Sequence, residues 1–205
     1  MGSRCAALLL SGGGSRRWGR QPKAQIPVRG RPALGYMAEV AVRAGCDPIV
    51  AVTGPGQEFA ESSLAGLPVR IVHVADAPEA RTGSIQAGLA TVPDGLDLLL
   101  WPVDHPFVRP ETVTGLLAAR TLGARGRWWV PEFEGRGGHP VVVGAAALPR
   151  IRALPAHAPL REARPEDPGD LRRLPVDDPG VVANIDDPQI HRSFLAAASA
   201  RGEAW

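Results

Sequence analysis

Residues 4 to 14 read RCAALLLSGGG, in which an apolar run through Leu10 ends at Ser11 and three glycines. Such a run is typical of a strand that is buried on both faces, as the strands of parallel sheets are. Glycines directly after a strand form a loop whose backbone can approach a phosphate and turn its N–H groups toward it. This stretch therefore predicts a parallel sheet with an anion site at the end of its first strand.

The alternation of strands and helices continues along the chain. Apolar residues at helical spacing over 33–44 predict a crossover helix. Further strands are expected over 48–53, 69–74 and 96–103, and helices over 57–64, 84–91 and 111–120. A glycine-rich turn over 135–138, between strands at 127–130 and 140–143, predicts a hairpin that breaks the parallel order. We expect short helices and loops over 150–180, a last strand over 181–185 and a closing helix over 188–200.

This pattern predicts a Rossmann-like, three-layer α/β sandwich with a mostly parallel sheet and an antiparallel hairpin insertion. We find no linker long enough to divide the 205 residues, so a single domain over residues 1–205 is expected. In open sheets of this kind, ligands bind beyond the carboxyl ends of the strands. The polar residues that follow each strand are therefore the candidate functional residues.

Composition and charge exclude several classes of protein. The formal net charge is +2 without a basic run, so binding to nucleic acid or to a membrane surface is not expected. The first apolar run is too short for a signal sequence or a membrane span. Cys5 and Cys46 are the only cysteines, which fits neither a disulfide framework nor a metal knuckle. We therefore expect a cytoplasmic protein.

Lys23 is the only lysine among 23 Lys and Arg residues. Because every other Lys or Arg position holds arginine, we expect the lysine at a place where a compact point charge must approach a phosphate oxygen. The alternative is that this one lysine remains by chance. The spacing between the glycines and Lys23 matches neither a P-loop nor a GxGxxG fingerprint. With Arg17 between them, the glycine loop and Lys23 are expected to bind a polyphosphate.

A longer segment, LLSGGGSRRWGRQPKAQIPVRGRPAL, resembles the nucleotidyltransferase signature L-A-A/G-G-x-S-x-R-M-G-x-x-K-x-L-x-x-x-G-x-P-L. It departs from the signature at Trp18 for Met, Ser11 for Ala and Gln25 for an apolar residue. WPVDHPFV, GRGGHPVVVG and VDDPGVVANIDDPQI resemble three later motifs of the molybdenum cofactor cytidylyltransferases. The resemblance runs from about residue 6 to residue 195.

This resemblance implies a glycosyltransferase-A-like nucleotidyltransferase fold and a set of site residues. The implied nucleotide-binding residues are Leu10, Ser11, Gly12, Gly13, Gly14, Ser15, Arg81, Ser84 and Gly88, and the implied acceptor-binding residues are His105, Gly138 and His139. The implied catalytic residues are Lys23, Arg17 and Asp104. Asp104 would hold Mg²⁺, which prefers oxygen ligands. A second ligand is expected from Asn184, which occupies the family position, or from Asp186, which keeps the charge.

Plainer roles stay open for several of these residues. Asp104 could cap the turn that follows it, Ser84 could belong to a helix N-cap, and the two motif histidines could be ordinary surface residues. Trp128 and Trp129 are expected in the core, with stacking on a ligand as the alternative.

The resemblance implies a Mg²⁺-dependent transfer of CMP from CTP to molybdopterin with release of pyrophosphate, and a molybdoenzyme client as a further partner. The base stays open, because Ser11-Gly12-Gly13 resembles the guanylyltransferase relatives, which use GTP. The alternatives are a guanylyl- or sugar-phosphate nucleotidyltransferase and a non-catalytic carrier of a nucleotide or cofactor. Loss of Lys23 or Asp104 would favour the carrier, and both residues are present.

Overall fold

A computed structural model describes residues 4–12, 22–55, 59–75, 81–122, 128–165, 167–186 and 188–205. Within these residues an eight-stranded sheet has the order β10-β7-β9-β6-β1-β4-β5, with β8 paired to β7. The strands are β1 (Cys5–Ser11), β4 (Ile49–Thr53), β5 (Val69–His73), β6 (Asp97–Pro102), β7 (Trp128–Phe133), β8 (Arg136–Gly137), β9 (Val141–Val143) and β10 (Leu171–Pro175). A separate hairpin joins β2 (Pro27–Val28) to β3 (Arg31–Pro32).

The sheet is mostly parallel, as the sequence predicts. β1 pairs in parallel with both β4 and β6, β4 pairs in parallel with β5, and β10 pairs in parallel with β7. β9 lies antiparallel between β6 and β7, and β8 forms the short hairpin with β7. The α/β fold with an antiparallel hairpin insertion is therefore confirmed.

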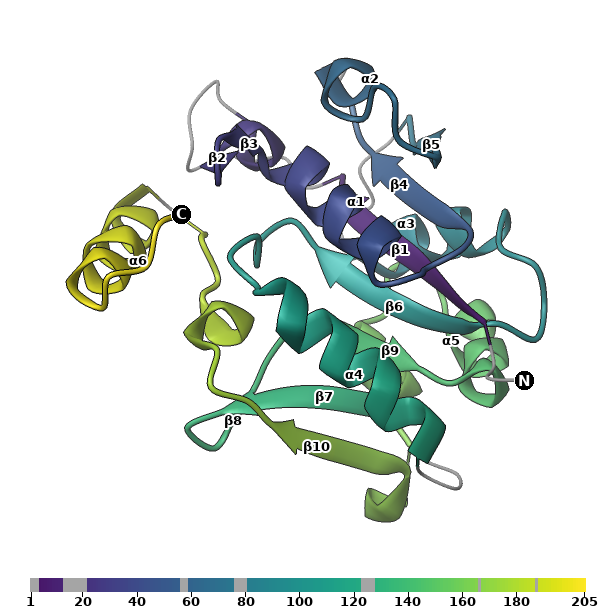
Figure 1. Cartoon of the computed structure of the whole chain (residues 1–205). Helices are drawn as coiled ribbons and strands as arrows, with labels where there is room; N and C mark the ends of the chain where they lie inside the picture. The colour runs from purple at the N-terminus through teal and green to yellow at the C-terminus, as the bar shows by residue number, and fades with distance from the viewer. Residues whose placement is uncertain are drawn as a thin grey trace.

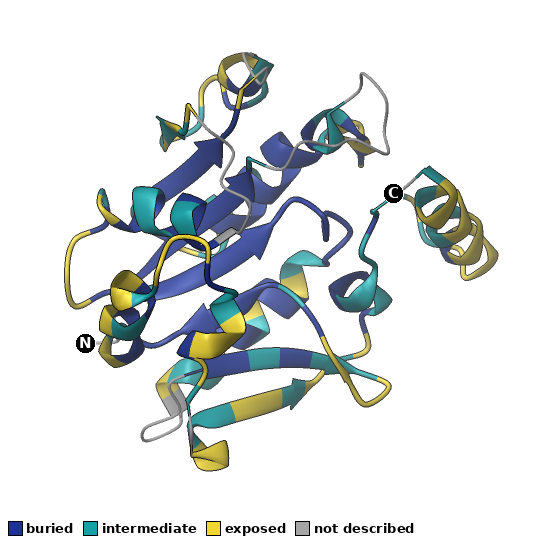
Figure 2. Ribbon diagram, turned by 180° about the vertical axis from the view of Figure 1, so that it is seen from behind, coloured by how far each residue is buried: buried dark blue, intermediate teal, exposed yellow. Residues whose placement is uncertain are grey.

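Helices cover both faces of this sheet. They are α1 (Ala33–Arg43), α2 (Phe59–Ser63), α3 (Arg81–Leu89), α4 (Pro110–Leu122), α5 (Leu148–Ala153) and α6 (Pro188–Ala200). Figure 1 shows α1 and α4 in front of the sheet and α3 and α5 behind it. Ala7 and Leu9 of β1 belong to the apolar core under α1 and α4, whereas Leu8 and Leu10 belong to the core under α3 and α5. Successive side chains of a strand point to opposite faces, so the apolar run of β1 is buried on both, and Figure 2 colours this strand as buried.

Three local expectations differ from the structure. Leu171–Pro175, expected to be loop or helix, is the edge strand β10. The prediction of a strand over 181–185 is wrong, since Pro179–Val182 forms a 3₁₀ turn (η6) and irregular chain follows. The physical reason is that Asp178 caps this turn by accepting a hydrogen bond from the Gly180 N–H. The third helix begins at Arg81 rather than Ser84.

The C-terminal segment is tied to the rest of the fold by aromatic and charged contacts. Phe194 of α6 stacks on Phe107 with ring centroids 4.6 Å apart, and the Trp205 ring meets the edge of Phe107 at 5.5 Å. Glu203 accepts a hydrogen bond from Arg201 at 2.7 Å. Chiefly because of this hydrogen bond, the pKa of Glu203 is lowered to about 2. The Glu203 carboxyl is therefore ionised over most of the pH range and can keep its charged contacts in the C-terminal segment.

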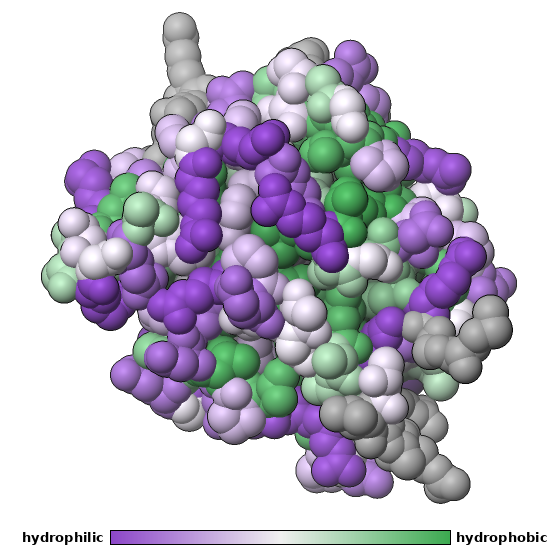
Figure 3. Space-filling model, in the orientation of Figure 1, coloured by the Kyte–Doolittle hydropathy of each residue, from purple (hydrophilic) through white to green (hydrophobic). Residues whose placement is uncertain are grey.

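The surface of the described residues is mixed in polarity. Hydrophobic side chains appear in patches between hydrophilic ones on the face drawn in Figure 3. Ile190, at 41% exposure, is the exposed large hydrophobic residue of this part of the chain. Among the same residues, no helix has the length and apolar character that a membrane span requires.

Candidate functional site

The strand order reverses beside β1. The chain passes from β1 outward to β4 and β5, then returns to β6 on the other side of β1. In open α/β sheets this reversal opens a crevice beyond the carboxyl ends of the two central strands. Ser11 ends β1, and Asp104 follows β6 closely. The N–H of Val103 donates to the carbonyl of Leu10 at 2.9 Å, so the ends of β1 and β6 lie side by side.

Lys23 lies between two of the candidate metal carboxylates. Its Nζ is 3.1 Å from Oδ1 of Asp104 and 3.1 Å from Oδ1 of Asp186. The side chains of Lys23 and Asp104 are each 11% exposed, and that of Asp186 is 40% exposed. The structure therefore brings together three residues that are far apart in the sequence and that the sequence analysis singled out. The alternative of Asp104 as only a turn cap does not account for this ion pair.

Asp178 anchors the segment that leads to Asp186. Its carboxylate is buried, at 1% exposure, and accepts hydrogen bonds from the Thr112 hydroxyl at 2.6 Å and from the N–H groups of Arg109 and Gly180 at 2.9 Å. A buried carboxylate with three donors is well satisfied and holds the chain firmly. Sequence analysis missed this role, although an Asp-Pro-Gly tripeptide is a typical signal of a capped turn.

The anchored segment contacts both of the motifs that follow β6 and β8. The N–H of Ile185 donates to the carbonyl of Asp104 at 2.9 Å, and the N–H of His139 donates to the carbonyl of Val181 at 2.9 Å. A side chain on Gly138 would overlap Val181, which explains why a glycine is needed there. Three separate motifs of the sequence thus meet at one end of the sheet.

The two motif histidines lie against each other. The ring centroids of His105 and His139 are 4.8 Å apart, and the ring planes are inclined by 50°. His105 is 7% exposed, and its carbonyl accepts a hydrogen bond from the Trp101 indole at 2.8 Å. This bond fixes the backbone directly after Asp104. The interpretation of His105 as an ordinary surface histidine is therefore wrong.

On the other side of β1, Gly12 faces Ser84. A methyl group on Gly12 would lie 3.5 Å from Ser84 Oγ, which is an ordinary contact distance. Ser11 and Ser84 are buried, and a methyl group on Gly54 would lie 2.9 Å from the Gly12 carbonyl oxygen. The ends of β1 and β4 and the first turn of α3 therefore meet here. Since α3 begins at Arg81, Ser84 lies inside the helix, and its interpretation as an N-cap is wrong.

The resemblance implies further nucleotide-binding residues besides Ser11, Gly12 and Ser84. Gly13, Gly14, Ser15 and Arg17 lie outside the described residues. Leu10 is 7% exposed at the end of β1.

Gly88 is buried between α3 and the sheet, where a side chain would overlap Leu8 and Val52. Gly88 therefore has a role in helix–sheet packing, and its implied nucleotide contact stays a prediction.

The carboxylates at Lys23 fit a hard divalent cation. Asp104 and Asp186 already converge on one ammonium group, and Oδ1 of Asn184 is buried without a hydrogen bond from the described residues. In this part of the chain no three His, Cys, Asp or Glu side chains gather as a metal site. Mg²⁺ in nucleotide sites typically takes one or two carboxylates and completes its shell with water and phosphate oxygens. Asp104 and Asp186 suit that role, and Asn184 stays a candidate.

Taken together, a doubly wound sheet, a glycine and serine at the first strand end, and a lysine between two carboxylates are the features expected of a nucleotide-binding transferase site. The chain belongs to the MobA-like NTP transferase domain family, whose model matches residues 7–168.

Two curated relatives show how this domain is used elsewhere. The chain is 35% identical over 112 residues to the bifunctional protein GlmU of Alkalilimnicola ehrlichii, an alignment that covers 54% of this chain and 24% of that protein. It is 32% identical over 148 residues to nicotine blue oxidoreductase of Paenarthrobacter nicotinovorans, covering 70% of this chain and 72% of that protein. The chain thus spans about a quarter of the length of the GlmU relative.

Solved structures show the same fold over nearly the whole chain. Rv0371c from Mycobacterium tuberculosis H37Rv superposes with a TM-score of 0.77 at 23% identity, covering 95% of this chain and 99% of that one. Its complex with manganese gives a TM-score of 0.75 at 21% identity, covering 95% and 100%. CMP:2-keto-3-deoxy-manno-octonic acid synthetase complexed with CTP gives 0.70 at 14% identity, covering 97% and 100%.

Proposed function

We propose that this nucleotidyltransferase transfers CMP from CTP to the phosphate of molybdopterin and releases pyrophosphate. The observation that carries the proposal is the position of Lys23, whose Nζ lies 3.1 Å from both Asp104 and Asp186 beside the ends of β1 and β6. A triphosphate beyond these strand ends would meet a cation and two metal-binding carboxylates at once. The motifs that carry the resemblance to the molybdenum cofactor cytidylyltransferases are the ones that meet at this point.

The residues of the site would act by position and charge. The acceptor phosphate already has nucleophilic oxygens, so transfer requires alignment and charge neutralisation more than a general base. Lys23 would turn from the carboxylates to the phosphate oxygens as nucleotide and metal enter. Asp104 and Asp186 would then hold a divalent cation, preferably Mg²⁺, which neutralises charge on the departing pyrophosphate. The manganese complex of Rv0371c supports a divalent cation in this fold.

The choice of CTP is supported by the Ser84 loop, which resembles the loop of the cytidylyltransferases in which a serine approaches the nucleotide. A methyl group on Gly12 would lie 3.5 Å from Ser84 Oγ, so this hydroxyl lies beside the end of β1. A structural relative holds CTP on the same fold. GTP is the alternative, because the missing side chain at Gly12 leaves room that a purine could use.

Melting shifts and pyrophosphate release test the base and the acceptor. All four triphosphates are compared with Mg²⁺, with and without molybdopterin, and CTP with molybdopterin should release pyrophosphate fastest. A tenfold preference for CTP over GTP at equal, saturating concentration is worth about 1.4 kcal/mol, or roughly 3–6 °C in melting temperature for a chain of this size. Gly12→Ala should reduce the GTP shift more than the CTP shift. An equal or larger shift with GTP, together with GTP-dependent pyrophosphate release, would overturn the choice of CTP.

A second candidate comes from the nicotine blue oxidoreductase relative, of which the alignment covers 72%. Hydride transfer from a nicotinamide cofactor would not use a lysine paired with two carboxylates, so the site favours nucleotidyl transfer. Oxidation of NADH or NADPH with a dye acceptor, without pyrophosphate release from any triphosphate, would reverse this preference. A non-catalytic carrier would show neither reaction.

Three further statements remain predictions from the sequence. We propose that residues 1–205 act as one domain, that the protein works in the cytoplasm, and that a molybdoenzyme receives the product. Copurification with a molybdoenzyme tests the last of these.

A further inference from the structure

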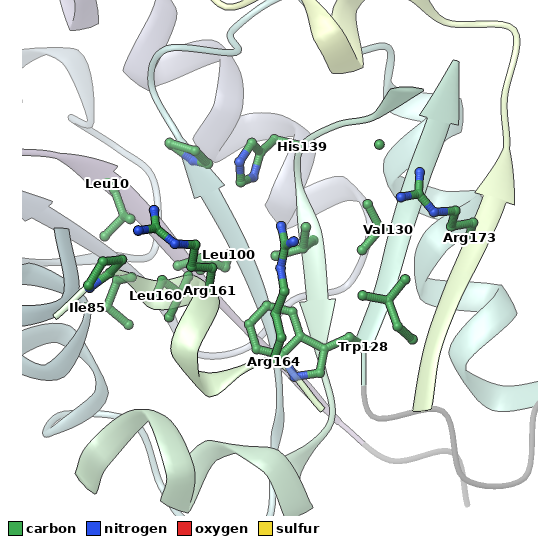
Figure 4. Close-up of a pocket in the computed structure, with 15 residues that line it drawn as sticks. Leu10, Ile85, Leu100, Trp128, Val130, His139, Leu160, Arg161, Arg164 and Arg173 are labelled. Atoms are coloured by element: carbon green, nitrogen blue, oxygen red, sulfur yellow. The ribbon is translucent and has the colours of Figure 1, made fainter. Parts of the chain in front are cut away.

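A cavity of about 520 Å³ lies on the sheet face that carries α3 and α5. Its floor is apolar and comes mainly from the central and outer strands, including Leu100 of β6 and Trp128 and Val130 of β7 (Figure 4). Ile85 of α3 and Leu160 of the 3₁₀ turn η4 (Leu160–Ala163) form part of its wall. Cavities of this size typically hold a whole small molecule.

Three arginines line the cavity, and two of them have no counter-charge among the residues that the structure describes. Arg173 of β10 pairs with Glu132 at 2.8 Å. Arg161 and Arg164 are exposed and make no ion pair within the part of the chain that the structure describes. In Figure 4 their guanidinium groups stand above the floor, on the side where His139 lies. Two unpaired guanidinium groups over an apolar floor favour a ligand that carries a phosphate on an apolar or aromatic body.

Trp128 adds a second sign of a ligand. The residue is 3% exposed, and its Nε1 has no hydrogen-bond partner among the described residues. A buried indole N–H normally finds an acceptor. The Trp128 residue also lines the cavity. The core position expected for Trp128 is confirmed, and its stacking on a ligand stays a prediction.

The cavity borders the transfer site. His139 lines it, and the His139 ring lies 4.8 Å from the ring of His105, which directly follows Asp104. Leu10 also lines it and directly precedes Ser11 at the end of β1. A ligand in the cavity can therefore bring a phosphate toward the strand ends where the nucleotide is expected.

We propose that this cavity binds the acceptor, that the acceptor is a phosphomonoester of a planar ring compound, and that Arg161 and Arg164 bind its phosphate. The ring lies against Trp128 and the strand floor, with the phosphate on the His139 side. This inference rests on the proposed function, because it assigns the second substrate of that reaction. Neither arginine belongs to a motif that carries the family resemblance.

FMN and riboflavin provide a matched pair of probes, since they share a planar ring system and only FMN carries a phosphate. Binding is measured by flavin fluorescence, with Mg²⁺ and saturating CTP present so that the nucleotide site is filled. We expect FMN to bind at least tenfold more tightly than riboflavin. The double variant R161Q/R164Q should lose at least tenfold in FMN affinity and keep riboflavin affinity within twofold. Arg172→Gln, an exposed neighbour on β10 that does not line the cavity, should change neither.

The outcomes separate this inference from the proposed function. FMN binding that is no tighter than riboflavin binding, or that R161Q/R164Q leaves unchanged, would overturn the acceptor cavity. Lys23→Ala should stop pyrophosphate release while FMN affinity stays within twofold, because Lys23 does not line the cavity. If Lys23→Ala removed FMN binding, the flavin would be in the nucleotide site and the inference would be wrong. If Lys23→Ala left pyrophosphate release intact, the proposed function would be wrong and the assignment of the cavity would remain.

Discussion

Replacing Lys23 with alanine removes the ammonium group that Asp104 and Asp186 share. At 3.1 Å and an effective dielectric constant near 20, each pair attracts by about 5 kcal/mol before desolvation is counted. Desolvation offsets much of this, and removing one partner of a buried pair typically costs about 3–5 kcal/mol. Because Asp186 is 40% exposed and water screens it, we expect the lower end of this range. Lys23→Ala should therefore lower the free energy of unfolding by about 3 kcal/mol without metal.

Mg²⁺ should compensate for the lost stability but not for the lost turnover. Without the ammonium, both carboxylates are open to a divalent cation, and a ligand at 100 times its dissociation constant adds about 2.7 kcal/mol. Turnover should fall by at least about 100-fold even with saturating Mg²⁺, since a preorganised charge on the transferring phosphates is typically worth that much. Lys23→Arg should recover stability but little turnover, because a planar guanidinium fork cannot replace a compact charge.

Calorimetry in EDTA and in excess Mg²⁺, together with pyrophosphate release, measures both effects. For a chain of this size, 3 kcal/mol corresponds to roughly 6–12 °C in melting temperature. Arg31→Ala is the matched control: it breaks a 2.8 Å pair with Glu39 in which the arginine is 55% exposed, and it should cost less than about 1 kcal/mol. If Lys23→Ala melted like the unmodified protein in EDTA, the ion pairs would carry no stability. Full activity of Lys23→Arg would refute the argument from the single lysine.

Three further changes test the site and its support. Asp104→Asn should raise the Mg²⁺ concentration for half-maximal turnover at least about tenfold, and unchanged activity at limiting Mg²⁺ would remove Asp104 from the metal site. Gly180→Ala should lower the free energy of unfolding, measured in urea, by about 3 kcal/mol because its methyl would overlap the Phe107 carbonyl. Gly115→Ala in α4 is the control: a methyl there has nothing within 4 Å and should raise the free energy of unfolding by up to about 1 kcal/mol. Equal effects of the two changes would contradict this packing. Glu203→Gln should cost about 1 kcal/mol at neutral pH, and the cost should shrink as the pH falls from 4.5 to 2, because a depressed pKa makes the ionised form the stabilising one. A cost that persists at pH 2 would contradict that assignment.

The sequence pattern could predict the parallel half of the sheet because those strands are recognisable locally. β1, β4 and β6 are continuous apolar runs, which is what burial on both faces requires. β10 could not be recognised in this way, since Arg172 and Arg173 are exposed, charged residues and only the pairing with β7 makes the segment a strand. Charged residues are typical of such edge strands.

The same distinction holds for the site. Lys23 and Asp104 could be predicted because each stands in a motif with its own spacing. The meeting of Asp186 with Lys23 depends on Asp178 and Gly180 holding the chain against distant segments, which no local pattern contains. Arg161 and Arg164 were missed because they lie in a proline-rich, charged stretch where the sequence predicts only loop and short helix.

The extent of the family match bears on where specificity resides. The match ends at residue 168, yet Asp186 supplies the second carboxylate at Lys23, and Arg173 of β10 lines the acceptor cavity. The later segment is bound to Asp104 through the Ile185 N–H at 2.9 Å, so it belongs to the same physical unit as the matched residues. The nucleotide site and the acceptor cavity use different residues, because Lys23 and Asp186 do not line the cavity. To change the acceptor and keep the triphosphate, one would exchange the residues around the cavity between relatives rather than those around Lys23.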